Sequence, residues 1–163
     1  MTYQENYQKW VDFADLPDYL RRDLESMDEK TKEDAFYTNL EFGTAGMRGL
    51  IGAGTNRINI YVVRQATEGL ARLIESKGGN EKERGVAIAY DSRHFSPEFA
   101  FESAAVLAKH GIKSYVFESL RPTPELSFAV RHLNCFAGIM VTASHNPAPF
   151  NLSLIHISEP TRP

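Results

Sequence analysis

The sequence predicts an α/β fold: a three-layer α/β/α domain with a mainly parallel mixed sheet, preceded by a helical N-terminal extension. Short apolar runs alternate with amphipathic segments, two of which begin with a cap residue followed by proline. The connections between these segments are short, as in parallel strands joined by right-handed crossover helices. The chain has 163 residues, which suits one domain with a buried core.

The first 40 residues are rich in charged and aromatic side chains, and we expect them to be helical. Apolar positions before residue 15 recur at helical spacing, and Pro17 breaks this pattern before a second helix that runs through Leu24. A further short helix is expected over residues 32–40. We interpret this region as an extension packed on the main domain, with no chemistry of its own.

The main domain is expected to begin with a glycine-rich loop over residues 43–54. An amphipathic helix follows from about residue 62 to 76, because apolar side chains recur every three or four positions and two glycines come after it. The next helices begin where Ser96 and Thr123 can act as caps, each before a proline. The remaining expected elements are a strand over 85–91, a helix to about 109, a strand over 112–117, a helix over 124–132 and a strand over 136–141.

Composition and charge exclude several classes of partner. The net charge is -3 at pH 7, so no basic surface indicates nucleic acid or an anionic membrane as the main partner. No stretch approaches the roughly 20 apolar residues of a membrane span. The single cysteine, Cys135, excludes an intrachain disulfide and is expected to be a buried small hydrophobe. We therefore expect a soluble cytoplasmic protein.

Residues 43–49 combine three glycines with Arg48 and indicate phosphate binding. Glycines let backbone N–H groups approach an anion, and a guanidinium can bind two phosphate oxygens at once. The segment is not a Walker P-loop, because no Gly-Lys-Ser/Thr follows at the required spacing. A glycine-rich turn is structural about as often as it is functional, and the arginine favours the phosphate interpretation here.

Two further loops follow expected strands at the same edge of the sheet. In the first, Asp91 is interpreted as a local ion pair or cap, whereas Arg93 could also add positive potential near a phosphate. In the second, the prolines stiffen the segment 121–124, and Thr123 is most simply a helix cap.

The segment 142–147, with the sequence Thr-Ala-Ser-His-Asn-Pro, directly follows the last buried strand. Ligands bind at the carboxyl ends of strands in open α/β sheets, so Ser144 is the first candidate nucleophile. Serine hydrolysis is the weaker interpretation, because no Gly-x-Ser-x-Gly elbow surrounds the serine and His145 is its direct neighbour. Anion-binding elements at the same edge favour a serine that accepts a phosphoryl group.

These motifs resemble those of the α-D-phosphohexomutases. Residues 142–147 are similar to the phosphoserine loop of that family, residues 42–49 to its N-terminal signature, and residues 91–93 also fall at a family position. The helical start and the segment 121–126 further resemble bacterial α-phosphoglucomutases of the longer type, a subgroup near the phosphopentomutases.

The resemblance implies that Ser144 carries a phosphoryl group and passes it to glucose 1-phosphate, through glucose 1,6-bisphosphate, to release glucose 6-phosphate. It implies that His145 assists substrate binding or proton handling, and that Thr44, Arg48 and Arg93 bind substrate or phosphate. Mg²⁺ would bind Ser144 through its phosphate. The other metal ligands of the family lie in a second domain, and domains II to IV of a parent chain are missing here.

The resemblance stops at Asn151, because the Asn-Gly-x-Lys segment of the family is absent. We expect residues 1–40 to form the extension and 41–151 to form domain I. Residues 152–163 resemble translated sequencing adapter, and we expect a non-native tail, although the apolar Leu154, Ile155 and Ile157 would also suit a natural C-terminal strand.

The implied activity is that of a phosphoglucomutase, of which this chain would be a truncated and inactive first domain. Phosphomannomutase or phosphopentomutase activity is a close alternative, because the first domain carries chemistry more than sugar choice. A non-catalytic phosphate-binding or interaction domain is the alternative from another class.

Overall fold

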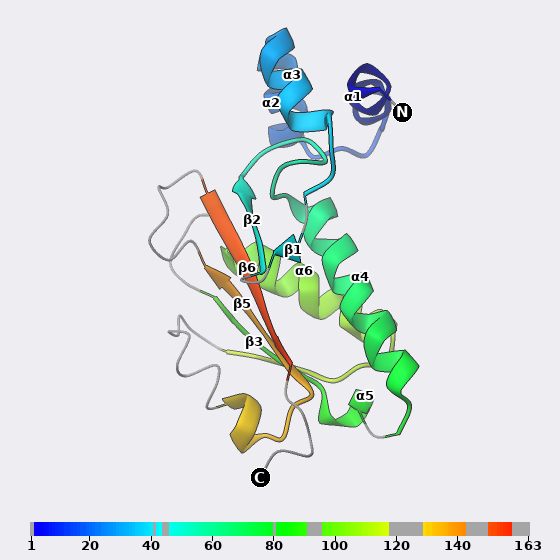
Figure 1. The fold of residues 1–163 in the computed structure, drawn as a ribbon, viewed down its shortest axis with the longest axis vertical. Coiled ribbons are helices and arrows are strands. Elements are labelled where there is room, and N and C mark those ends of the chain that lie inside the picture. The colour runs from blue at the N-terminus through cyan, green and yellow to red at the C-terminus, as the bar shows by residue number, and fades with distance from the viewer. Residues whose placement is uncertain are drawn as a thin grey trace.

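The computed structural model describes residues 2–40, 42–43, 46–79, 81–90, 96–117, 129–142 and 150–157. Residues 129–132 are helical. The other helices and strands, in chain order, are α1 (Tyr3–Val11), α2 (Asp18–Ser26), α3 (Glu29–Phe36), β1 (Phe42–Gly43), β2 (Gly46–Leu50), α4 (Ile60–Lys77), α5 (Glu81–Arg84), β3 (Val86–Tyr90), α6 (Ser96–Lys109), β4 (Ser114–Val116), β5 (Ala137–Thr142) and β6 (Phe150–Ile157). Figure 1 shows α1, α2 and α3 together beyond one end of the sheet.

The six strands form one mixed sheet in the order β1-β2-β6-β5-β3-β4. β3 pairs in parallel with both β4 and β5, whereas β6 is antiparallel to both β5 and β2. β1 is antiparallel to β2. The strands β2, β3, β4 and β5 therefore run in one direction, and the expected mixed sheet is confirmed.

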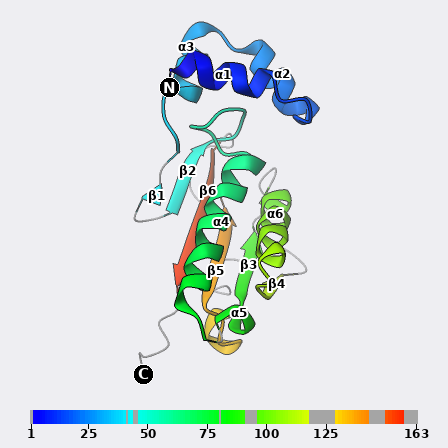
Figure 2. The same cartoon turned by 90° about the vertical axis from the view of Figure 1, so that its right-hand side faces the viewer.

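Helices cover both faces of the sheet and give the expected three layers. α4 and α6 lie side by side on one face (Figure 2), where their apolar side chains form the main core with residues of β2, β3 and β5. On the other face, Ala129 and Val130 pack against Ala87, Ala89 and Met140. The central strand β3 is buried along its whole length, as expected for a parallel strand covered on both sides.

The strands and helices expected in the main domain after residue 60 are confirmed where the structure describes them. β3, β4 and β5 fall on the three apolar runs, and α4 and α6 fall on the two amphipathic segments. Of the helix expected over 124–132, only residues 129–132 are described. Cys135 is a fully buried free cysteine, and burial raises the pKa of its thiol, which disfavours the reactive thiolate.

The prediction of a loop over residues 43–54 is wrong in its first half. Residues 46–50 form β2, which pairs with β1 on one side and with β6 on the other. Backbone N–H and C=O groups make these pairs, so glycines can take part without the alternating apolar pattern that marks a strand in sequence. Met47 is buried in the structure, but a single buried apolar residue does not make an alternating pattern. The short helix α5 was not expected either.

The last described strand, β6, runs through the expected boundary between Asn151 and Leu152 without a break. It pairs with β5 from Ala137 to Thr142 and with β2 from Met47 to Leu50. The segment thus adopts the strand that its apolar residues suited. Its position between β2 and β5 makes it the link between the glycine-rich strand and the parallel part of the sheet.

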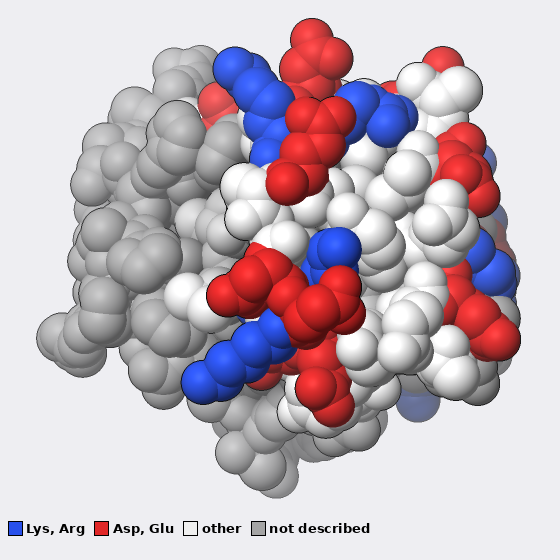
Figure 3. Space-filling model, turned by 90° about the horizontal axis from the view of Figure 1, so that it is seen from above, with Lys and Arg blue, Asp and Glu red and all other residues white. Residues whose placement is uncertain are grey.

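The expected N-terminal extension is helical and has a small core of its own. Leu20, Leu24 and Phe36 are almost completely buried in it. The Phe36 ring lies edge-to-face against Tyr7 and Trp10, with ring centroids 5.6 and 5.7 Å apart. Such aromatic pairs contribute about 0.5–1.5 kcal/mol each beyond the area they bury. Figure 3 views the molecule from this end, where acidic and basic side chains are interspersed.

Two glycine substitutions should have opposite effects on stability. Gly69 is exposed within α4 and an added Cβ would meet nothing within 4 Å, so Gly69→Ala should stabilise the chain by roughly 0.5–1 kcal/mol through helix propensity. Gly85 has a φ of +77° and its Cβ would lie 2.5 Å from the carbonyl oxygen of Lys113, so Gly85→Ala should cost about 2 kcal/mol or more. Urea unfolding of both variants measures these changes; equal effects would contradict this account.

A histidine bridges α4 and the end of α6. His110 Nδ1 lies 2.6 Å from Glu75 Oε1, and His110 Nε2 lies 2.9 Å from both carboxylate oxygens of Glu68. Hydrogen bonds to Glu68 and then Glu75 raise the pKa of His110, and the same contacts lower the pKa of each glutamate. Each of the three charged forms is therefore favoured in the folded chain.

This cluster predicts a pH-dependent contribution to stability. Because the folded pKa of His110 is raised, its contribution is complete below about pH 6.5 and is lost as pH rises through the folded pKa. The contribution of the glutamates is present above about pH 4.5 and is lost as pH falls through their lowered pKa values. His110→Gln should therefore lower Tm more at pH 6 than at pH 9. An equal decrease at both values would contradict the charged cluster.

Candidate functional site

The candidate site lies at the edge of the sheet where β3 and β5 end. These strands are parallel, with Tyr90 in register with Val141. Arg93 comes three residues after Tyr90, and Ser144 comes two residues after Thr142, the last residue of β5. Since both strands point the same way, the two segments that follow them leave from the same edge of the sheet.

The pairing register of β2, β6 and β5 aligns Arg48 with the end of β5. In β2 it pairs with Leu152 of β6, and Leu152 pairs with Thr142 of β5. Neighbouring strands lie about 4.8 Å apart, so the backbones of Arg48 and Thr142 are roughly 10 Å apart. The antiparallel strand β6 thus aligns the arginine of the glycine-rich segment with Thr142, the first residue of the segment 142–147 that contains the serine.

The other residues predicted for the site lie outside the described part of the chain. These are Thr44, Arg93, Ser144 and His145, and the backbone of Arg48 alone is described. Asp91 and Thr123, which were interpreted as cap residues, also lie outside the described part of the chain. The strands that precede these segments are nevertheless described, and their register places the backbone of Arg48 level with Thr142, the last residue of β5.

The loop after β2 is held by a buried asparagine that was not singled out from the sequence. The Asn59 side chain, 1% exposed, donates from Nδ2 to the carbonyl oxygens of Gly52 and Gly54, both at 2.9 Å. Its Oδ1 accepts from the backbone N–H groups of Tyr61 and Val62 and so caps α4. An asparagine before an apolar helix is a cap signal that could have found it.

The helical extension is hydrogen-bonded to this same loop. Asp23 accepts from the backbone N–H of Ala53 at 2.7 Å, and the Thr55 hydroxyl donates to the carbonyl oxygen of Thr38 at 2.7 Å. Gly54 has a φ of +133°, and an added Cβ would lie 2.6 Å from the carbonyl oxygen of Ala35. The extension therefore packs directly on the residues that follow β2.

An ion pair joins the same two parts. The Arg57 guanidinium, 9% exposed in its side chain, lies 2.8 Å from the carboxylate of Asp34 in α3. Arg57 also donates to the carbonyl oxygen of Asn56 at 3.1 Å. Sequence reasoning missed this pair, because nothing in the local pattern indicates that residues 34 and 57 meet. The extension thus helps to position the loop between β2 and α4.

The described residues provide no ready-made metal centre. No group of three or more His, Cys, Asp or Glu side chains among them could hold a metal ion. None of the helices in the described ranges combines the length and apolar character needed to cross a membrane.

A protein-family model matches most of the chain. Residues 39–159 match the model described as phosphoglucomutase/phosphomannomutase, alpha/beta/alpha domain I. The chain belongs to this family. The phosphohexomutase match begins near the expected start of domain I, and it continues beyond Asn151 through β6.

Relatives of this phosphohexomutase domain are named phosphoglucomutases. The chain is 42% identical over 143 residues to one from Staphylococcus epidermidis, a match that covers 87% of this chain and 25% of the relative. It is 48% identical over 120 residues to one from a bovine strain of Staphylococcus aureus, covering 74% of this chain and 21% of the relative. The chain therefore spans about a quarter of the length of the curated relatives it matches.

A solved structure has the same fold. A Thermus thermophilus protein described as a phosphomannomutase matches with a TM-score of 0.65 and 33% sequence identity. The match covers 74% of this chain and 26% of that protein. The family and the α/β/α fold expected from sequence are thus confirmed.

Proposed function

We propose that this chain is the serine-bearing first domain of a phosphoglucomutase, and that the whole protein interconverts glucose 1-phosphate and glucose 6-phosphate in the cytoplasm. Ser144 would carry the phosphoryl group, and glucose 1,6-bisphosphate would be the intermediate. The observation that supports this most is the register of Arg48, Leu152 and Thr142, because it brings a cationic segment level with the serine segment.

In the proposed reaction, the bond between phosphorus and Ser144 Oγ breaks as a bond forms from phosphorus to the 6-hydroxyl oxygen of glucose 1-phosphate. The hydroxyl proton leaves at the same stage, with His145 proposed to handle it. The bisphosphate then turns over and returns its 1-phosphate to Ser144, which releases glucose 6-phosphate. Thr44, Arg48 and Arg93 are proposed to bind the phosphates. The two arginines are cations that stabilise the charge on a transferring phosphoryl group, and the Thr44 hydroxyl can donate a hydrogen bond to it.

Mg²⁺ is the proposed cofactor, with the phosphate on Ser144 as its ligand from this chain. When bound, it would neutralise charge on the transferring group. The described residues provide no cluster to complete its coordination, so the other ligands are proposed to come from the missing domains II to IV.

The 163-residue chain alone should have no measurable mutase turnover. The chain spans about a quarter of its relatives, so the proposed sugar-reading and metal-binding domains are missing. A coupled assay that detects glucose 6-phosphate formed from glucose 1-phosphate, with Mg²⁺ and glucose 1,6-bisphosphate present, measures this directly. Turnover above that of a Ser144→Ala control would overturn the proposed division of the active site among domains.

Phosphomannomutase activity is a second candidate, because the Thermus thermophilus structure that matches the fold is described in those terms. The higher identity to proteins named phosphoglucomutase favours glucose phosphates. Comparing mannose 1-phosphate with glucose 1-phosphate as substrates of the whole protein separates the two. The same comparison with ribose 1-phosphate tests phosphopentomutase activity, and phosphate binding without turnover would indicate a non-catalytic domain.

We also propose that domain I spans residues 41–151, after the extension 1–40, and that residues 152–163 are not native. Residues 152–157 pair with β5 in this chain, and the proposal implies that a family member supplies the strand at this place with its own sequence. Sequencing the source DNA tests the proposal: a genomic reading frame that runs unbroken through Leu152 to Pro163 would refute it.

A further inference from the structure

A pocket lined by none of the residues predicted for the phosphoryl site lies between the extension and the first turn of α4. It has a volume of about 320 Å³ and is lined by Lys9, Trp10, Phe13, Leu16 and Tyr61. This volume is at the lower end of the range of small-molecule sites. Four of its five lining side chains are apolar or aromatic, so its walls favour an apolar guest.

The aromatic walls stand at right angles to one another. The Tyr61 ring lies at 83° to Trp10 and at 89° to Phe13, with ring centroids 5.5 and 5.8 Å away. A flat ring that enters such a corner can stack on one wall and present its edge to another, which are the two favoured aromatic geometries. Phe13 remains 46% exposed, so one wall is open to solvent.

Two polar groups at the pocket have no hydrogen-bond or ion-pair partner within the described part of the chain, although the Arg64 guanidinium lies 5.4 Å from the centroid of the Tyr61 ring. The Lys9 ammonium makes no ion pair there, and the Tyr61 hydroxyl makes no hydrogen bond there. Burial chiefly raises the pKa of Tyr61, so its hydroxyl stays protonated and can donate. The neighbouring Arg64 is already paired with Glu102 at 2.7 Å. An ammonium and a hydroxyl donor beside aromatic walls complement an anion attached to an aromatic ring.

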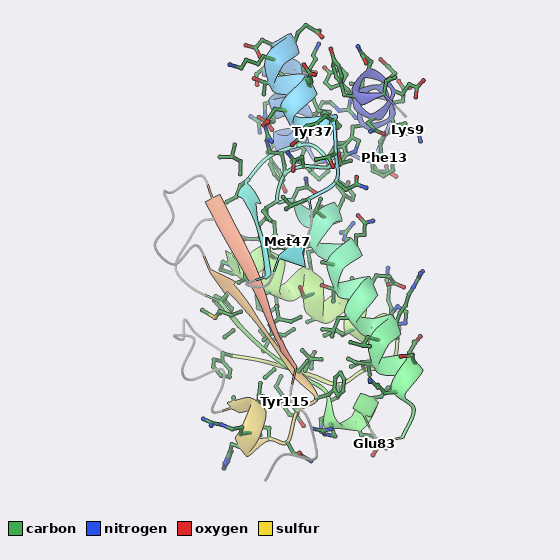
Figure 4. All side chains as sticks on the ribbon, in the orientation of Figure 1. Lys9, Phe13, Tyr37, Met47, Glu83 and Tyr115 are labelled. Carbon is green, nitrogen blue, oxygen red and sulfur yellow. The ribbon has the colours of Figure 1, made fainter. Side chains whose placement is uncertain are left out.

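We propose that this pocket binds a small planar aromatic molecule that carries one anionic group, with the ring against Trp10, Phe13 and Tyr61 and the anion at Lys9. Figure 4 shows Lys9 and Phe13 close together at the end of the molecule formed by the extension. The exposed Asp15 also lies within electrostatic range of Tyr61, and it should weaken the binding of an anion. This proposal does not depend on the proposed mutase activity.

The single tryptophan of the chain makes the test direct. Trp10 gives one indole N–H signal in an NMR spectrum of the ¹⁵N-labelled chain, and this signal reports on the pocket wall. The probes are 1-naphthoate and its neutral analogue 1-naphthalenemethanol. Both should shift the indole signal saturably, and 1-naphthoate should bind more tightly.

Three variants separate the parts of the site. Lys9→Gln should weaken 1-naphthoate about two- to fivefold and leave the neutral probe unchanged. Asp15→Asn should strengthen 1-naphthoate alone, and Phe13→Ala should weaken both probes by about fivefold or more. All three residues lie at the surface, and circular dichroism checks that each variant is folded. Shifts that never saturate, or a Lys9→Gln variant that binds both probes as before, would overturn the proposal.

Discussion

Ser144→Ala should abolish phosphoryl transfer in an enzyme that contains this domain. A suitable enzyme is a chimera in which residues 1–151 replace the matching N-terminal part of the Staphylococcus aureus phosphoglucomutase, which is 48% identical over the matched region. The proposed serine is both donor and acceptor of the phosphoryl group, so its loss should lower kcat by about 10,000-fold or more. The conversion of glucose 1-phosphate to glucose 6-phosphate measures this.

The matched control is Ser76→Ala. Ser76 is an exposed serine near the end of α4 whose hydroxyl donates to the carbonyl oxygen of Leu73 at 2.7 Å. This change should leave kcat unchanged, because the residue is not in the proposed site. A Ser144→Ala chimera that retains a tenth of the activity would show that another residue carries the phosphoryl group.

Asn59→Ala should be strongly destabilising. The change removes the cap of α4 and leaves the carbonyl oxygens of Gly52 and Gly54 without the buried donor that they share. A lost cap costs about 1 kcal/mol, and unpaired buried polar groups cost about 1–3 kcal/mol, so a loss of roughly 3 kcal/mol is expected. Urea unfolding of the 163-residue chain measures it.

A second asparagine in the same loop provides the comparison. Asn56 donates one side-chain hydrogen bond, to the carbonyl oxygen of Asp34 at 3.0 Å, from a partly exposed position. Asn56→Ala should therefore cost about 1 kcal/mol or less. If both variants lost the same free energy of unfolding, the buried network around Asn59 would not be what holds the loop after β2.

The parallel part of the fold could be predicted from local sequence, because its signals are local. β3 is a continuous apolar run, and α6 begins at Ser96 followed by proline. β2 could not be predicted in this way, because its pairing with β6 depends on residues about a hundred positions away. Its glycines show no alternation of apolar and polar side chains.

The candidate site was partly predictable for the same reason. Ser144 follows an apolar strand, which can be recognised directly in the sequence. The alignment of Arg48 with Thr142, in contrast, depends on how β6 pairs with β2 and β5. The contacts of the extension with the loop after β2 were not foreseen, because Asp34 and Arg57 meet only in the folded chain. The extension therefore has a structural role in the domain that its sequence alone did not indicate.

Mass spectrometry of the chimera, quenched during turnover and digested into peptides, tests whether Ser144 carries the phosphoryl group. The proposed mechanism predicts one phosphoryl group on the peptide that contains residues 142–147, located at Ser144 and absent from the Ser144→Ala variant. A phosphoryl group on another residue, or an active chimera with no phosphorylated peptide at any time point, would contradict it.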